Sequence, residues 1–180
     1  VEDVAEAVAW VSKNISKWGG DANKIAIMGH SAGAHIVALL CTNESYLKKH
    51  GLPLTTLKAC ASLDTEAYDI PYKVDNGSLE DNQLITNAFG NDRSVWQQAS
   101  PINYISSGKG IPPFLLVERG TADRRAVLNK FLDKLRMQGI ENITLRSDNL
   151  THEEVSERIG IEGDLIVTPV LVSFLHFVFK

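Results

Sequence analysis

One stretch of the sequence, residues 25–40, constrains the fold more than any other. It reads IAIMGHSAGAHIVALL, an apolar run, a glycine-flanked turn and then a run of small and apolar residues. The first run has the length of a short buried strand, and the second has the composition of a buried helix. Gly29 and Gly33 flank Ser31, which indicates a turn too tight for bulky side chains on either side. We expect a strand, a sharp turn carrying Ser31, and a helix.

Short apolar strands and helices alternate through the rest of the chain. Turn residues separate the expected strands (24–28, 57–63, 114–118 and 143–146) from the expected helices (1–18, 31–41, 124–138 and from about 168). This alternation predicts an α/β fold, with a mostly parallel sheet covered by helices on both faces. The length of 180 residues fits a single domain spanning residues 1–180.

Residues 65–110 interrupt this alternation. The segment contains several aromatic residues, one expected helix at 79–89, and the turn-forming residues Pro71, Gly77, Gly90, Pro101 and Gly108. An excursion of this length between two strands is usually functional. We expect it to form a cap or wall over a pocket at the carboxyl ends of the strands, where open α/β sheets bind ligands. The alternative is a structural insertion whose aromatic side chains pack on one another.

Composition excludes several classes of function. The net charge is −4 and the basic residues are scattered, so no nucleic-acid-binding patch is expected. Cys41 and Cys60 lie in apolar runs without metal-ligand spacing, which favours a place in the core. The longest apolar run, residues 165–179, is shorter than the roughly 18 residues of a membrane span, so we expect a buried terminal helix there.

The turn at residues 29–33 has the G-x-S-x-G pattern of a nucleophile elbow, and the flanking strand and helix are the context that the pattern requires. Ser31 is therefore the candidate nucleophile. A serine hydroxyl needs a base to take its proton, and the base needs an acid to orient it. Of five histidines, His152 is the candidate base, because it alone follows the last strand on a loop; the others are His30, His35, His50 and His176.

Two carboxylates compete for the role of the orienting acid. Asp123 follows the third expected strand, on a loop that enters a helix, and Asp64 ends the second expected strand. Asp123 also has a purely structural interpretation, as a helix cap. The two interpretations of Asp123 are not exclusive, and we favour it over Asp64. Asp148 lies too close to His152 in sequence to be the first choice.

Four segments together, GGDANKIAIMGHSAGAHIVALL, FGNDRSVWQQASPINYI, LLVERGTADRRA and THEEV, resemble an α/β-hydrolase. Within that fold they are similar to the esterase and lipase branch that includes microbial carboxylesterases and kynurenine formamidases. The resemblance implies a triad of Ser31, Asp123 and His152, and it implies that the backbone N–H of Ala32 is an oxyanion donor. It also implies a substrate pocket near SLDTEAYDI, for which the candidates are His30, Asp64, Tyr68 and Trp96.

The sequence departs from this family at its start. Family members have further strands before the first helix and a His-Gly-Gly loop that supplies other oxyanion donors, and neither precedes Ser31 here. The serine-bearing strand would then be a bare apolar sheet edge, which proteins avoid. We therefore expect the chain to be the C-terminal part of a longer one, or its edge to be covered by a second copy.

The sequence predicts a serine hydrolase that cleaves small carboxylic esters. No metal or organic cofactor is implied. Two alternatives stay open: cleavage of an N-formyl aryl amide by the same residues, and a hydrolase-fold module that binds a ligand without catalysis.

Overall fold

A sheet of four parallel strands forms the centre of the computed structural model, which describes residues 1–80 and 82–180. The strands are β1 (Ile25–His30), β2 (Leu57–Leu63), β3 (Phe114–Glu118) and β4 (Asn142–Arg146), and they lie side by side in chain order. Each neighbouring pair is parallel. The prediction of an α/β fold with a mostly parallel sheet is confirmed.

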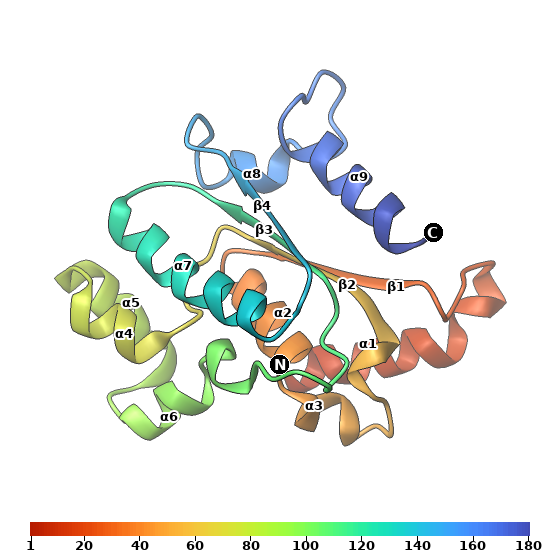
Figure 1. Cartoon of the computed structure of the whole chain (residues 1–180), viewed down its shortest axis with the longest axis horizontal. Coiled ribbons are helices and arrows are strands. Elements are labelled where there is room, and N and C mark those ends of the chain that lie inside the picture. The colour runs from red at the N-terminus through yellow and green to blue at the C-terminus, as the bar shows by residue number, and fades with distance from the viewer.

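Helices cover both faces of this sheet (Figure 1). They are α1 (Glu2–Asn14), α2 (Ala32–Thr42), α3 (Glu44–Lys48), α4 (Ile70–Asn76), α5 (Leu79–Phe89), α6 (Arg93–Gln98), α7 (Ala122–Met137), α8 (Glu154–Glu157) and α9 (Val167–Val178). Short 3₁₀ turns occupy Ile15–Trp18, Leu54–Thr56 and Pro101–Tyr104. Figure 1 shows α2 and α7 on one side of the sheet, and α8 and α9 on the other.

Alternate strand residues face opposite layers, as a pleated strand requires. One core cluster joins α2 and α7 to the sheet through residues that include Val37, Cys60, Phe114, Leu116 and Phe131. The other joins α8 and α9 to the opposite face through residues that include Ala61, Leu115, Val117, Val155 and Phe174. The two central strands, β2 and β3, are buried on both faces, which explains why their sequences are apolar runs rather than alternating patterns.

The two most apolar helices differ in how deeply they are buried. Residues 37–42 of α2 are all buried, as its nearly uniform apolar character predicted. In α9, by contrast, Val167, Leu171 and Phe174 pack on the sheet, while Val172 and Phe177 are 43% and 51% exposed. The expectation of a buried terminal helix is therefore correct for one face of α9 only, because it lies on the outside of the sheet and nothing in the described residues covers its far side.

The serine-bearing strand lies at the end of the sheet. Among the described residues β1 pairs with β2 alone, and Met28 on this strand is 47% exposed.

None of the helices in the described part of the chain has both the length and the apolar character that a membrane crossing requires.

Candidate functional site

The carboxyl ends of the parallel strands bring the polar residues of the site to one edge of the sheet. Ser31 follows β1, Asp64 follows β2, Arg119 follows β3, and the loop after β4 carries His152. Backbone bonds continue the strand ladder past the strand ends: Ser31 N–H donates to the Leu63 carbonyl at 3.0 Å, and Asp64 N–H donates to the Val117 carbonyl at 2.8 Å. The sheet itself therefore fixes the backbone positions of Ser31 and Asp64.

Ser31 occupies a sharp turn between β1 and α2. Its φ is 57° and its ψ is −120°, a combination that non-glycine residues adopt at a cost of about 1–3 kcal/mol. The turn places Ser31 at the N-cap of α2, where the helix dipole favours negative charge. In the described residues the N–H of Ala32, the first residue of that helix, has no backbone acceptor, so it is free to donate to an incoming oxygen.

The two glycines that flank Ser31 have different roles. A Cβ atom on Gly29 would lie 2.3 Å from the Gly33 carbonyl oxygen and 2.4 Å from its carbon, whereas a Cβ on Gly33 would meet nothing within 4 Å. The sequence pattern had indicated that both positions exclude bulk. The structure shows that only Gly29 does, because at that point β1 passes against the backbone of the first turn of α2.

We expect Gly29→Ala to lower the free energy of unfolding by about 1–3 kcal/mol or more, since the clash is with backbone that has little room to move. Gly33→Ala should be neutral or stabilising by up to about 1 kcal/mol, because alanine is the better helix former and Gly33 lies in α2. Urea unfolding of both variants measures the difference. Equal stability of the two variants would contradict this account of the turn.

Ser31, His152 and Asp64 form one continuous chain of hydrogen bonds. His152 Nε2 lies 2.8 Å from Ser31 Oγ, and His152 Nδ1 lies 2.6 Å from Asp64 Oδ2. The Asp64 side chain is almost fully buried, so its carboxylate is held away from bulk water. A buried carboxylate on Nδ1 fixes the imidazole tautomer that leaves Nε2 free to accept the serine proton.

The predicted orienting acid is wrong, because Asp123 does not contact His152. Its side chain is exposed in the first turn of α7 and lines a separate cavity of about 170 Å³ with Tyr72 and Asn76. Helix α7 begins at Ala122, so Asp123 is already turned toward α4, and its charge favours the helix N-terminus. Asp64, the competing candidate, takes the position beside His152.

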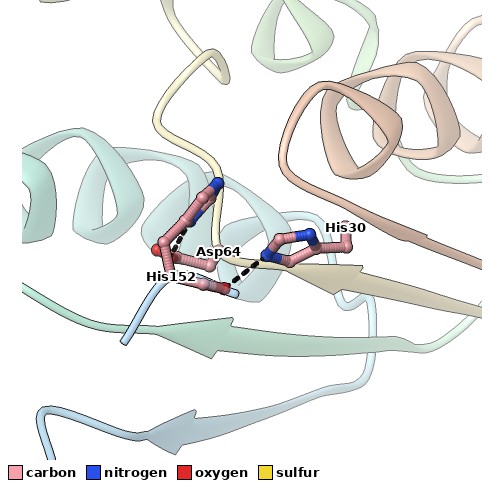
Figure 2. A group of neighbouring side chains, drawn as sticks. All are labelled: His30, Asp64 and His152. Atoms are coloured by element: carbon pink, nitrogen blue, oxygen red, sulfur yellow. Dashed lines mark hydrogen bonds and ion pairs between the residues drawn. The ribbon is translucent and has the colours of Figure 1, made fainter. Parts of the chain in front are cut away.

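His30 holds the loop that carries His152. Its Nε2–H donates to the His152 carbonyl oxygen at 2.7 Å, and the two imidazole rings lie 4.4 Å apart between centroids. Figure 2 shows His30, Asp64 and His152 gathered at this point, with His30 directed at the backbone of His152.

Ligand atoms of the three residues lie within 4.8 Å of one another, a spacing that a metal ion could bridge. A metal would have to replace hydrogen bonds that all three residues already make.

A cavity of about 550 Å³ opens beside Ser31 and His152. Its wall on one side is apolar and comes from α5, with Leu84, Ile85, Ala88 and Phe89. Of the predicted pocket residues, Asp64 lines this cavity, whereas His30, Tyr68 and Trp96 do not.

Tyr68 and Trp96 belong to the core instead. Tyr68 is 1% exposed, stacks on Phe131 and shares a 2.8 Å hydrogen bond with the Ser62 hydroxyl. Trp96 packs in a small cluster with Ile70 and Ile85, and its indole N–H donates to the Gly90 carbonyl. Tyr68 thus joins the 65–110 segment to α7 and β2, whereas Trp96 packs within the segment itself, and both rings have a structural role.

Comparison with known proteins identifies the family of the chain. Residues 1–130, which include the elbow, Asp64 and the strand before Arg119, match the family model described as BD-FAE. The chain belongs to the BD-FAE family. It is thus a member of the α/β-hydrolase fold in its esterase and lipase branch, as the sequence motifs indicated.

Relatives of this BD-FAE chain include two esterases of Mycobacterium tuberculosis. It is 30% identical to esterase LipQ over 123 residues and 31% identical to esterase LipC over 124 residues. These alignments cover 65% and 64% of this chain but only 29% and 30% of the two esterases. The chain therefore spans less than a third of the length of these curated relatives.

Solved esterase structures share the fold over nearly the whole chain. Esterase B from Lactobacillus rhamnosis superposes with a TM-score of 0.71 at 14% identity, over 99% of this chain and 61% of that one. An esterase from Rhizomucor miehei gives a TM-score of 0.69 at 22% identity, over 99% of this chain and 59% of that one.

The structure adds charged residues to the site that the sequence analysis missed. Arg119 Nε lies 2.7 Å from Asp64 Oδ2, and Arg124 Nη2 lies 2.5 Å from Asp64 Oδ1. Arg124 also reaches Glu66, and all of these side chains line the cavity. The only sequence signal was the pair of arginines that bracket the GTAD segment after β3, next to a strand end that supplies Asp64.

His35 also lines the cavity, from the second turn of α2. Burial lowers the pKa of its imidazole, although the hydrogen bond to the Ala99 carbonyl works in the opposite direction. Its ring also contacts Phe89 of α5 edge-on. A neutral His35 therefore joins α2 to the helix that forms the apolar wall.

Proposed function

We propose that this protein is a serine hydrolase that cleaves carboxylic esters of small substrates through an acyl-enzyme intermediate. The observation that carries the proposal is the hydrogen-bonded chain from Ser31 Oγ through His152 to Asp64, which opens onto a cavity large enough for a small ester. The esterase names of its relatives support the same reaction class.

The first half of the reaction forms the acyl-enzyme. His152 Nε2 takes the Ser31 proton as Oγ attacks the ester carbonyl carbon, and the carbonyl oxygen becomes an oxyanion. The N–H of Ala32 donates to this oxyanion, with the N-terminal end of α2 adding a favourable field. The imidazolium of His152 then protonates the departing alkoxide, and the alcohol leaves.

The second half releases the acid. Water gives a proton to His152 Nε2 and attacks the acyl carbon, and the second tetrahedral intermediate collapses as His152 returns that proton to Ser31 Oγ. Throughout, Asp64 holds Nδ1–H and stabilises the imidazolium, while His30 keeps the backbone of His152 in place.

A fluorophosphonate probe tests the proposal directly, because it reacts only with an activated serine. We expect the native protein to be labelled on the peptide that contains Ser31, and the Ser31→Ala variant to remain unlabelled. Heat-denatured protein is the control, since an unfolded chain has no activated serine. Labelling at another serine, or none in the native protein, would exclude the mechanism and favour a binding module.

A further inference from the structure

Arg119 places a guanidinium group in the same cavity as the reacting groups. It follows β3 and lines the cavity together with Ser31 and His152, and its side chain is 27% exposed. Its Nε donates to Asp64 Oδ2, the oxygen that also binds His152 Nδ1. Arg119 Nε and His152 Nδ1 therefore bind the same oxygen of Asp64.

The two arginines of the cavity differ in how many of their donors are used. Arg124 donates through Nε to the Arg119 carbonyl, through Nη1 to Glu66 and through Nη2 to Asp64. Arg119 donates through Nε alone, and its two terminal nitrogens have no protein acceptor in the described part of the chain. A guanidinium carries five N–H donors in a planar fork that matches a carboxylate. Arg119 therefore keeps its two terminal nitrogens available for a ligand.

The acidic residues that line the cavity do not bind the two terminal nitrogens of Arg119. Asp64 has both oxygens engaged by arginine or histidine donors. Glu66 pairs with Arg124 at 3.0 Å through Oε1 and with Lys73 at 2.7 Å through Oε2. An anion that enters the cavity thus meets the terminal nitrogens of Arg119, and both carboxylates that line the cavity in the described residues already have partners. Glu153, whose charge also interacts with Arg119, is not part of the lining.

We propose that Arg119 binds a carboxylate of the substrate, so that the preferred substrates are esters that carry a carboxylate on the acyl or the alcohol side. The apolar part of such an ester lies against α5. This inference rests on the proposed ester hydrolysis and specifies its substrate class. A partly desolvated, charge-assisted hydrogen bond of this kind changes binding by about 10- to 100-fold.

Two pairs of esters of matched shape test separately whether the carboxylate is bound on the acyl side or on the alcohol side of the substrate. On the acyl side, monoethyl glutarate is compared with ethyl 5-methylhexanoate by acid release. On the alcohol side, 4-acetoxybenzoate is compared with 4-isopropylphenyl acetate by release of the phenol. The measured quantity is the ratio of kcat/KM for the anionic ester to that for the neutral ester, because general damage to the triad cancels in this ratio.

In the native protein we expect this ratio to favour the anionic ester in one of the two pairs. Arg119→Gln should lower the ratio about 10- to 100-fold. Arg119→Lys should lower it less, because the charge stays but the fork is lost. Arg125→Gln is the matched control: it removes a neighbouring arginine that does not line the cavity, and the ratio should not change.

Unchanged ratios in both Arg119 variants, with Ser31-dependent hydrolysis of the neutral esters intact, would overturn the role of Arg119 and leave the proposed function standing. Absence of Ser31-dependent hydrolysis of all four esters would overturn both. If Arg119→Gln does not fold, the same comparison rests on Arg119→Lys and on competitive inhibition of the native protein by glutarate and benzoate, which should bind better than 5-methylhexanol and cumene.

Discussion

Replacing Ser31 with alanine is expected to lower kcat about 10⁶-fold, the scale of loss seen when a triad nucleophile is removed. The substitution removes only the hydroxyl group, and no other hydroxyl is hydrogen-bonded to His152 Nε2 in the described residues. The loss in kcat is measured by the rate of aryl-ester hydrolysis, down to the rate of the uncatalysed reaction.

Stability separates this chemical effect from unfolding. Ser31 adopts a backbone conformation that alanine also adopts only with strain, so Ser31→Ala should melt within a few degrees of the native protein. A variant that keeps its melting temperature and retains more than about a hundredth of the native rate would contradict the assignment of Ser31 as the nucleophile.

Replacing Asp64 with asparagine is expected to lower kcat about 10⁴-fold, the magnitude known for the corresponding change in a well-studied serine protease. The asparagine amide would offer N–H to His152 and favour the wrong imidazole tautomer. It would also leave Arg119 and Arg124 without their carboxylate, and breaking a buried ion pair costs about 3–5 kcal/mol. Asp64→Asn should therefore lose stability as well as activity.

Asp123→Asn is the matched control for that change, because it makes the same carboxylate-to-amide replacement in the first turn of α7, after the strand that pairs with β2. Asp123 is exposed and lies outside the triad, so we expect near-native kcat and a stability change within about 0.5 kcal/mol. Kinetics of both variants under the same conditions decide between the two carboxylates, and a larger loss for Asp123→Asn would return the role to Asp123.

The layout of the fold was predictable from local patterns. The expected strands at 24–28, 57–63, 114–118 and 143–146 agree with β1 to β4 to within about two residues at each end, because each is a short run rich in apolar or β-branched residues bounded by turn residues. The meeting of Ser31 and His152 at one edge of the sheet was predictable for a similar reason, since a motif singles out Ser31 and a loop after the last strand carries His152.

The orienting acid was not predictable in the same way. β2 and β3 are parallel neighbours, so a carboxylate at the end of either strand reaches the same edge of the sheet. What distinguishes them is the left-handed backbone of Asp64, whose φ is 54°, and the early start of α7 at Ala122. Neither feature leaves a periodic trace in the sequence, and the arginines that bind Asp64 are 55 and 60 residues away from it along the chain.

The apolar wall of the cavity and its reacting groups come from separate parts of the chain. Ser31 and Asp64 directly follow strands and His152 lies on the loop after β4, whereas Leu84, Ile85, Ala88 and Phe89 all belong to α5. Substitutions along one face of α5 can therefore reshape the cavity without replacing any residue of the proposed triad. Such an arrangement would let selection, or a directed-evolution library confined to these four positions, change the preference for substrates while the proposed catalytic residues are kept.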